Sequence, residues 1–437
     1  MVAHRGDRRQ LPVLPATRCI PSMTLDTVVR CRFLGQAQIE IGHTLVTPEA
    51  ERLFALLMVL ACEAGRTFNR SELVTLLWPD VSEDKGKHSL RQSIYKARQA
   101  GAPFETAGEE IRFTKHAVYR DWDEPRMPVH GEWLGAYTAA FSDALAVWVL
   151  GRRATIHAGL RPRMIAHMQA VRSSGDIHEA GRLAEQILRI DPLNEEAVLV
   201  TAESYAMAGA KIDALRLLDE YIEEVGRVSD SPELLMPAKI LRFRIAEKLP
   251  ISTYSTGEPH ELSLVGRERQ FKQLVAALFD VRGKRGATTW LWGSEGIGKS
   301  RLISEQLKVA TLQGIRVVRE RYPTGESKAG GHLVGLLKRL LDTPGALGSD
   351  PATLANLKRV ADGSAAPQSN DLRSGMVELI HAIAEEQPLY IVLDGADNWL
   401  PDELNLMSDI VSGLRNAEAG LLISTRRSPR TLGAELS

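Results

Sequence analysis

Residues 288–300 have the sequence TTWLWGSEGIGKS, and this stretch decides the fold of the C-terminal part of the chain. Its first part, TTWLW, is typical of a short buried strand. Its second part, Gly293 to Ser300, matches the phosphate-binding loop pattern G-x-x-x-x-G-K-[ST] in full. A helix is predicted over residues 299–310, where N-terminal N–H groups and the helix dipole favour an anion. The flanking strand and helix argue against a chance glycine-rich turn.

Each residue type in this loop has its own expected role. Gly293, Gly296 and Gly298 are expected to adopt backbone conformations that a Cβ would forbid, so that successive N–H groups point at phosphate oxygens. Lys299 would reach the β- and γ-phosphates as a catalytic group, and the Ser300 hydroxyl would hold Mg²⁺. The loop therefore predicts a site for ATP or ADP with Mg²⁺.

Further strands are predicted at residues 316–318, 389–394 and 420–424. The segment 389–394, LYIVLD, has the Walker B pattern of apolar residues that end in a carboxylate. Asp394 would then bind Mg²⁺ and take part in catalysis, whereas the alternative is a buried strand that ends at a turn. Strands that alternate with helices predict a parallel sheet covered on both faces, with ligand at the carboxyl ends of its strands.

The composition indicates a globular protein of several domains. A chain of 437 residues is too long for one ordinary core, and about three domains are expected. The net charge is −1, so any basic surface must be local. Three cysteines without metal spacing (Cys19, Cys31 and Cys62) fit a reducing compartment. No apolar run is long enough to span a bilayer, so no membrane partner is expected.

Two segments are expected to lie outside folded domains. Residues 1–24 are predicted to be a disordered lead, because they are basic but lack the apolar region of a secretory signal. Met23 is an alternative start of the chain. Residues 251–263 are rich in Ser, Thr, Gly and Pro and are predicted to be a linker.

Residues 25–126 predict a small α/β module with a basic helix. The expected order is two strands (28–33 and 36–41), a helix that begins at Pro48, a helix that is capped by Asn69, a helix at 87–100 and a hairpin at 103–120. No Asp or Glu occurs between Lys85 and Phe104. Arg and Gln on such a face can bind base edges in a major groove, while Lys contacts phosphates. The alternative is a solvated basic face on a structural helix.

This module resembles the OmpR-type winged helix-turn-helix, and specifically the DNA-binding domain of SARP-type activators. The resemblance rests on the segments FLG, TPEAERLFALLMVLA, SELVTLLWPD and SLRQSIYKARQA. It implies that residues 87–98 are the recognition helix and that the hairpin is a wing. The candidate DNA contacts are Lys87, His88, Arg91, Gln92, Tyr95, Lys96 and Arg98, with Arg112 and Lys115 from the wing.

Residues 127–250 predict a helical repeat. A set of four residues recurs at an offset of 34 residues, which is the tetratricopeptide period. The set is Gly175, Ala180, Arg182 and Leu183, with the counterparts Gly209, Ala214, Arg216 and Leu217. Helices near 134–172 and 232–247 are expected to complete the stack. The segments GEWLGAY and ILRIDPLNEEAV resemble the bacterial transcriptional activation domain, which implies dimerisation and contact with the transcription machinery.

Residues 264–437 resemble the STAND and AAA-type ATPases. The segment that precedes the phosphate loop is similar to their adenine-side motif and contributes Val265, Gly266 and Arg267 to the expected nucleotide site. Residues 425–427 resemble the T-S-R sensor of STAND proteins, which implies that Arg427 lies near the γ-phosphate. Arg426, at the middle position, departs from this pattern.

Two further departures bear on catalysis. Gly395 stands where such domains usually carry a second acidic residue that orients the attacking water, and Asp397 lies three residues after Asp394. The chain also ends at Ser437, before the winged-helix lid that such proteins usually carry. We therefore expect either a truncated or a naturally short form of the domain, with at most slow ATP hydrolysis that acts as a switch.

The order of winged helix, helical repeat and STAND ATPase resembles the large SARP regulators of the AfsR type. This resemblance implies a bacterial, cytoplasmic transcriptional regulator, and specifically an activator, that binds double-stranded DNA at promoter repeats and is controlled by ATP or ADP. A homodimer or higher oligomer, RNA polymerase as a partner and association with the nucleoid are expected with it. The alternative is a nucleotide-sensing signalling scaffold that binds proteins rather than DNA.

Overall fold

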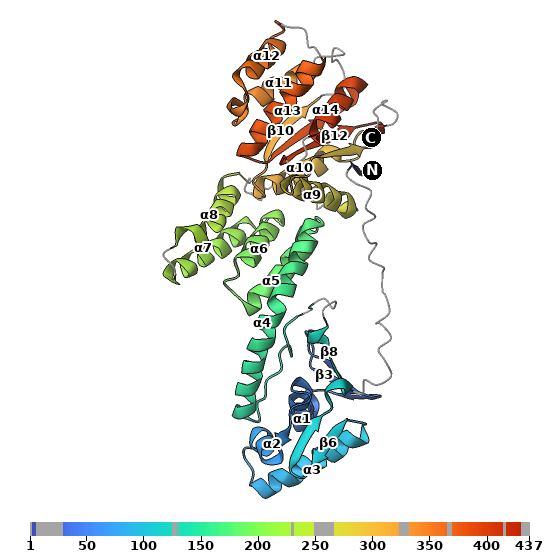
Figure 1. Ribbon diagram of the computed structural model, residues 1–437, viewed down its shortest axis with the longest axis vertical. Coiled ribbons are helices and arrows are strands. Elements are labelled where there is room, and N and C mark those ends of the chain that lie inside the picture. Colours follow the sequence, from blue (N-terminus) through green and yellow to red (C-terminus); the bar gives the residue numbers. More distant parts are fainter. Residues whose placement is uncertain are drawn as a thin grey trace, which may run out of the picture. The chain divides into compact units, whose positions relative to one another are not determined.

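The chain forms two compact units in a computed structural model (Figure 1). The N-terminal unit comprises residues 11–167 and 185–192, and the C-terminal unit comprises residues 1–10, 168–184 and 193–437. No helix among the described residues is long and apolar enough to cross a membrane. The structure describes residues 2–5, 29–124, 129, 131–228, 231–248, 266–322, 332–364, 369–413 and 417–429. The predicted linker at 251–263 lies outside these ranges.

The N-terminal unit contains the predicted strand pair, helices and hairpin. One sheet has the strand order β4-β3-β2-β8, in which β2 pairs antiparallel with β3 and parallel with β8. A second sheet has the order β5-β7-β6 and includes the hairpin. The elements are β2 (Val29–Arg32), β3 (Gln38–Ile41), β4 (Thr44–Val46), α1 (Glu51–Cys62), β5 (Phe68–Asn69), α2 (Arg70–Leu77), α3 (Glu83–Gln99), β6 (Phe104–Ala107), β7 (Glu110–Phe113) and β8 (Val118–Arg120).

Local signals explain most of these helix boundaries. The Asn69 side chain accepts a hydrogen bond from Ser71 N at 2.9 Å, which caps α2 as predicted. Thr47 makes no capping hydrogen bond, and a short 3-10 turn at Pro48–Ala50 precedes α1. Helix α3 begins at Glu83 rather than at residue 87, since Ser82 holds the extended backbone of an N-cap residue.

A long helix, α4 (Asp143–Ser173), follows this module, and its first part belongs to the same unit. Trp148 Nε1 donates a hydrogen bond of 3.2 Å to Glu63 Oε1 at the end of α1. Arg152 on α4 forms an ion pair with the same carboxylate. The helical segment predicted over residues 127–250 is thus divided between the two units.

The remaining helices of this segment carry the internal repeat. Gly175 and Gly209 have φ values of 86° and 83°, and they occupy the turns before α5 and α7. Ala180 and Ala214, the next pair in the repeat, are both fully buried. These residues therefore hold equivalent positions in two helical hairpins. The helices are α5 (Ile177–Ile190), α6 (Glu195–Met207), α7 (Lys211–Val228) and α8 (Met236–Phe243).

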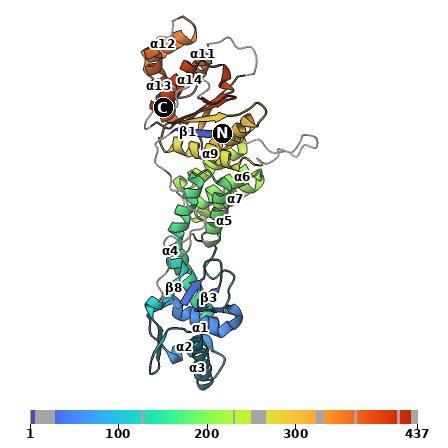
Figure 2. The same ribbon diagram turned by 90° about the vertical axis from the view of Figure 1, so that its right-hand side faces the viewer.

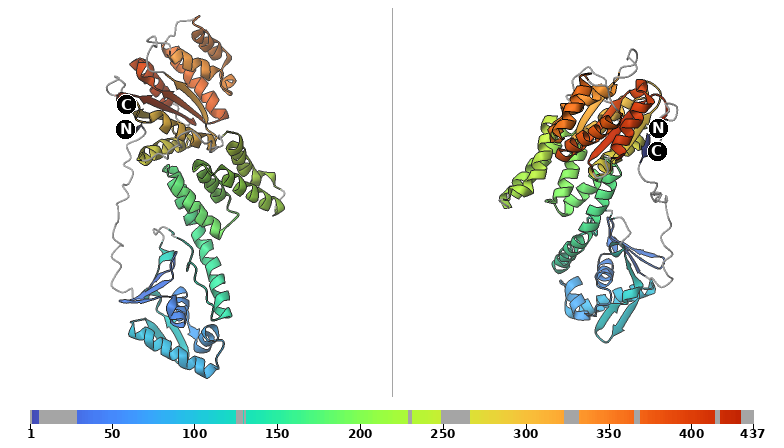
Figure 3. Two further views of the ribbon diagram at one scale, coloured as in Figure 1. Left: turned by 180° about the vertical axis from the view of Figure 1, so that it is seen from behind. Right: turned by 45° about the horizontal axis from the view of Figure 1, so that its top comes forward.

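The C-terminal unit contains a five-stranded sheet with the order β1-β9-β12-β11-β10. Strands β9, β12, β11 and β10 are parallel, as the alternation of strands and helices predicts. Helices cover both faces of the sheet (Figure 3). The elements are α9 (Glu268–Arg282), β9 (Ala287–Trp292), α10 (Lys299–Leu312), β10 (Arg316–Arg321), α11 (His332–Leu341), α12 (Pro351–Ala361), α13 (Ser369–Glu386), β11 (Leu389–Asp394), α14 (Pro401–Gly413) and β12 (Ala419–Thr425).

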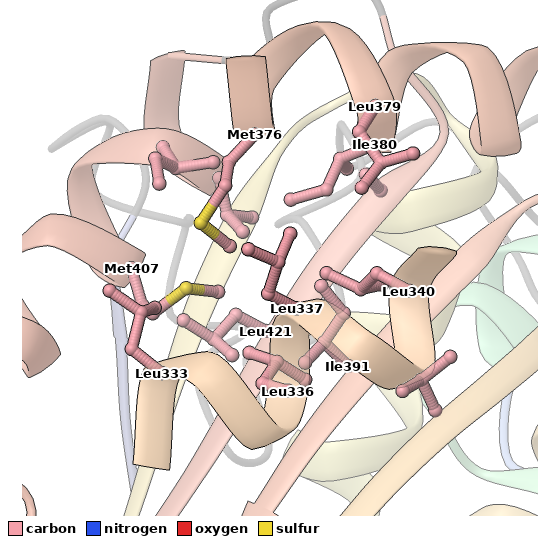
Figure 4. Close-up of a cluster of buried hydrophobic side chains, with 14 of the residues drawn as sticks. Leu333, Leu336, Leu337, Leu340, Met376, Leu379, Ile380, Ile391, Met407 and Leu421 are labelled. Atoms are coloured by element: carbon pink, nitrogen blue, oxygen red, sulfur yellow. The ribbon is translucent and has the colours of Figure 1, made fainter. Parts of the chain in front are cut away.

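Two apolar clusters hold this layered arrangement together. On one face, side chains from α11, α12, α13 and α14 pack against the sheet, among them Leu337, Met376 and Met407 (Figure 4). On the other face, α9 and α10 pack through residues such as Leu278 and Leu302. Strands β11 and β12 are buried along their whole length, as expected for parallel strands between two helical layers.

Residues 2–5 correct the prediction of a disordered lead over residues 1–24 for these four residues alone, and residues 6–24 lie outside the described residues. Val2–Arg5 form β1, which pairs antiparallel with β9 in the register Val2 to Leu291 (Figure 2). Without β1, strand β9 would present a row of unpaired backbone N–H and C=O groups at the edge of the sheet. Composition alone does not reveal this pairing, because it depends on an edge far away in the sequence.

Candidate functional site

The candidate nucleotide site lies at the carboxyl ends of the parallel strands. Trp292 at the end of β9 is in register with Thr425 on β12, and Asp394 at the end of β11 is in register with Ser424. The phosphate loop therefore begins beside β12, the strand that precedes the sensor segment, and β12 in turn lies beside the Walker B strand β11. This is the edge at which open parallel sheets bind their ligands.

The glycines of the phosphate loop serve two different purposes. Gly296 and Gly298 have φ values of 76° and 93°, the left-handed region that favours glycine, as predicted. Gly293 does not have a positive φ, which corrects the expectation for this residue. A Cβ at Gly293 would instead lie 3.3 Å from Ile297 Cγ2, so close approach within the loop accounts for it.

The Lys299 ammonium group lies within the phosphate loop. Its Nζ donates hydrogen bonds to the carbonyl oxygens of Gly293 at 2.7 Å and Ser294 at 3.0 Å. Burial lowers the pKa of Lys299, while the nearby carboxylates of Asp397 and Asp394 act in the opposite direction. This position over the loop is the one from which a lysine can exchange loop carbonyls for phosphate oxygens.

Ser300 and Asp394 fit the expected Mg²⁺ site. Ser300 Oγ donates a hydrogen bond of 3.2 Å to Asp394 Oδ1. Neighbouring ligands of an octahedral Mg²⁺ lie roughly 3 Å apart, because each metal–oxygen distance is about 2.1 Å. The hydroxyl and carboxylate are also the hard oxygen ligands that Mg²⁺ prefers. These two side chains would hold the metal, which would neutralise charge on the bound phosphates.

Gly395 has a structural reason for replacing an acidic residue. Its φ is 87°, and a Cβ at this position would lie 2.8 Å from the carbonyl oxygen of Tyr322. A side chain here would therefore strain the backbone and collide with the neighbouring segment. Asp397 is held by Arg426 instead. Its Oδ1 accepts a hydrogen bond of 2.6 Å from Arg426 N, and its Oδ2 lies 3.4 Å from Arg426 Nε.

The two arginines after β12 differ in their surroundings. Arg426 Nη1 lies 3.3 Å from Oε2 of Glu295, a residue of the phosphate loop. Arg427 is exposed, and its carbonyl oxygen accepts a hydrogen bond of 2.8 Å from Thr425 Oγ1. The geometry therefore brings Arg426 beside the phosphate loop, and the role of Arg427 near the γ-phosphate stays a prediction.

The predicted adenine-side residues precede α9. Gly266 has a φ of 76°, and its N–H donates a hydrogen bond of 3.0 Å to Glu268 Oε1. Arg267 is the N-cap residue of α9. Within the described residues, no hydrogen bond or ion pair joins Gly266 or Arg267 to the phosphate loop, and Val265 lies outside the described residues.

The predicted basic face of α3 is exposed on the N-terminal unit. Gly86, Leu90, Ile94 and Ala97 are buried and fix the orientation of the helix. Arg91 and Lys96 are exposed, and in the described part of the chain neither makes an ion pair. Lys87 differs, since its Nζ forms an ion pair of 2.8 Å with Glu83. The other exposed candidates on this face are His88, Gln92, Tyr95 and Arg98.

The hairpin is less suited to DNA than the sequence predicts. Arg112 is held by Glu105, with its Nε 2.7 Å from Oε2 of that carboxylate. Lys115 is exposed but lies in the 3-10 turn after the hairpin, beside Gly65. The turn between β6 and β7 carries Glu109, and Glu110 begins β7. Carboxylates at this position would repel the phosphates of a nucleic acid.

One charged residue of the site was not predicted. Arg319 on β10 places Nη2 2.6 Å from Asp394 Oδ2. Arginines at positions 319 and 321, two residues apart on β10, are the signal that could have indicated it. The sequence predicts only a strand at residues 316–318, and it does not indicate the contact of Arg319, because Asp394 lies on the neighbouring strand β11.

The fold and these contacts define a P-loop nucleotide-binding domain. Residues 263–423 match the AAA ATPase domain family, which confirms the AAA-type domain that the phosphate loop and the resemblance of residues 264–437 predict. No curated protein sequence matches the chain significantly. Among solved structures, the chain is similar to Mycobacterium tuberculosis EmbR in complex with a low-affinity phosphopeptide. That likeness has a TM-score of 0.35 and 15% identity and covers 59% of this chain and 72% of that one.

Proposed function

We propose that this protein is a sequence-specific DNA-binding transcriptional regulator, and specifically an activator, whose AAA-type domain acts as an ATP- or ADP-dependent switch. One observation carries the proposal, namely that an exposed basic helix and a complete phosphate loop occur in the same chain. The arrangement of strands and helices around α3 supports a winged helix-turn-helix. Arg91 and Lys96 on this helix are the contacts that we expect to matter most.

The helical segment is the proposed route between the two functions. Helix α10 begins at Lys299 in the phosphate loop, and its C-cap residue Gln313 donates a hydrogen bond to Glu203 on α6. Binding of Mg²⁺ and a γ-phosphate at one end of α10 could bias contacts at the other end. The repeat in α5 and α7 supports a tetratricopeptide-like scaffold for a second copy of the chain and for RNA polymerase.

The DNA part of the proposal is tested by selection of fragments from a random duplex pool. The purified full chain is expected to enrich a motif with repeated half-sites, and Arg91→Ala should lose it. Arg32→Ala is the matched control, because it removes an exposed arginine from β2 of the same unit and not from α3. Affinity should also fall steeply with salt, since phosphate contacts release counterions. Failure to enrich any motif would contradict sequence-specific recognition.

The nucleotide part is tested by ATP binding to the full chain. Lys299→Ala is expected to abolish binding, whereas Lys308→Ala, the same substitution farther along α10, should leave it unchanged. DNA affinity of the wild type should then differ between ATP and ADP, and this difference should vanish in Lys299→Ala. Equal ATP binding by Lys299→Ala and the wild type would contradict the proposed site.

A signalling scaffold that binds proteins is the second candidate function. Two observations favour it, namely the acidic hairpin turn and an apolar stripe on α8. Met236, Ile240 and Phe243 follow one another at helical spacing and are exposed by 48%, 40% and 58%. If this candidate is correct, the full chain will retain DNA only weakly and will enrich no motif. The salt dependence of this retention will be the same in Arg91→Ala as in the wild type.

A further inference from the structure

The two oxygens of the Asp394 carboxylate have different partners. Oδ1 accepts the hydrogen bond from Ser300 Oγ at 3.2 Å, and Oδ2 accepts one from Arg319 Nη2 at 2.6 Å. Only 7% of the Asp394 side chain and 20% of the Arg319 side chain are exposed. One oxygen therefore faces the phosphate loop, while the other is held by a partly buried guanidinium group.

The position of Arg319 follows from the pairing of β10 with β11. Arg319 is in register with Val392, and Arg321 is in register with Asp394. Because successive side chains of a strand point to opposite faces, these two arginines lie on the same face. Arg319 Nη1 also lies 3.5 Å from Ser304 Oγ, and Ser304 is one helical turn after Ser300 on α10. The guanidinium group is thus held between α10 and the end of β11.

This geometry distinguishes two roles for Arg319. A guanidinium group shared between both carboxylate oxygens would compete with Mg²⁺ for Asp394. Here the guanidinium group bonds to Oδ2 and leaves Oδ1 directed at Ser300. Carboxylates that bind metals are commonly oriented by such outer hydrogen bonds, and loss of an outer partner typically weakens metal binding by about 10- to 100-fold.

We infer that Arg319 is a positioning residue, which holds Asp394 Oδ1 toward Ser300 so that the two groups can bind the Mg²⁺ of a bound nucleotide. The inference rests on the nucleotide site proposed above. Arg321 does not share this role, because its Nε lies 3.6 Å from Asp394 Oδ2 and its side chain is 65% exposed. It is therefore a matched control on the same strand.

The test is a Mg²⁺ titration of the full chain with a fluorescent ATP analogue, together with binding of the analogue in the presence of EDTA. Arg319→Gln is expected to raise the Mg²⁺ concentration at half-maximal binding by about 10-fold. Binding in EDTA should change much less, and Arg319→Lys should recover part of the loss. Arg321→Gln should remain within about 2-fold of the wild type. An unchanged or lower Mg²⁺ midpoint in Arg319→Gln, or an equal shift in Arg321→Gln, would overturn the inference.

A double-substitution cycle shows whether Arg319 acts through Asp394. In an Asp394→Asn background, Arg319→Gln should cause no further rise in the Mg²⁺ midpoint, whereas an additive rise would contradict the assigned role. Circular dichroism identifies any variant that does not fold, and Arg319→Lys then carries the test. If the wild type binds no nucleotide, the proposed function itself fails. If it binds Mg–ATP but Arg319→Gln matches it, only the inference fails.

Discussion

Gln313 Nε2 donates a hydrogen bond of 2.9 Å to Glu203 Oε1, which joins the C-terminal end of α10 to α6. The same carboxylate accepts two hydrogen bonds from Arg172 Nη2, at 2.8 and 2.7 Å. Glu203 is 6% exposed. Within the C-terminal unit, a buried charge therefore connects the helical segment to the helix that begins in the phosphate loop.

Replacement of Glu203 should destabilise this unit. We expect Glu203→Ala to lower the free energy of unfolding by about 3 kcal/mol, because Arg172 and Gln313 would lose their buried partner. Urea unfolding measures the effect. The control is Glu223→Ala, since Glu223 is 67% exposed and pairs with Arg227 on the surface of α7, where the cost should stay below about 1 kcal/mol. An equal decrease in the free energy of unfolding for Glu203→Ala and Glu223→Ala would show that the buried hydrogen bonds of Glu203 do not stabilise the unit more than a surface ion pair does.

A second prediction concerns the glycine that follows the Walker B strand. Gly395→Asp should not give fast ATP hydrolysis, because the new side chain meets the Tyr322 carbonyl and strains a backbone with a φ of 87°. We expect a loss of about 1–3 kcal/mol in stability. Steady-state turnover and thermal unfolding measure the two effects.

The matched control separates backbone strain from collision. Gly363 has a φ of 77°, but a Cβ there would meet no atom within 4 Å. Gly363→Ala should therefore lower the free energy of unfolding by less than Gly395→Ala does. The difference between the two variants measures the effect of the collision with the Tyr322 carbonyl group. A Gly395→Asp variant with rapid turnover and normal stability would show that this glycine does not limit hydrolysis.

The sequence predicts those elements of the site that a short, contiguous pattern of residues indicates. The phosphate loop and β11 occupy the predicted residues, because the turn glycines and the buried strand are signalled by adjacent residues. The pairing of Arg319 with Asp394 was not predictable, because it depends on the register of β10 with β11. The contact between Arg426 and Glu295 likewise joins residues that only the folded sheet brings together.

The third prediction decides between the two arginines after β12. Arg426→Ala is expected to weaken Mg–ATP binding by about 10-fold, because its guanidinium group lies beside Glu295 and Asp397 at the phosphate loop. Arg427→Ala should change it by less than about 2-fold, since within the described residues no ion pair joins its exposed side chain to Glu295 or Asp397. Equilibrium binding of ATP and ADP measures both variants. The reverse order of effects would restore Arg427 as the sensor that the sequence resemblance implies.

The fourth prediction concerns pH and the N-terminal unit. Burial lowers the pKa of His157, with a further contribution from Arg153, and its Nε2 accepts a hydrogen bond of 3.2 Å from Trp133 N. The folded protein therefore holds His157 neutral, while the unfolded chain takes up a proton near the ordinary pKa of about 6.5. Above this pH, His157 should not reduce the free energy of unfolding. As the pH drops below it, the free energy of unfolding should decrease, because the unfolded chain binds a proton that the folded protein does not.

Urea unfolding of the full chain at about pH 7.5 and about pH 5.5 tests this expectation. The decrease in the free energy of unfolding on acidification should be about 1 kcal/mol smaller in His157→Gln than in the wild type. A glutamine oxygen can accept the hydrogen bond from Trp133 N, but glutamine does not titrate. His178→Gln is the control, since His178 is exposed on α5. If both variants lose as much stability on acidification as the wild type, then protonation of His157 is not linked to unfolding, and other groups must account for the pH dependence of this unit.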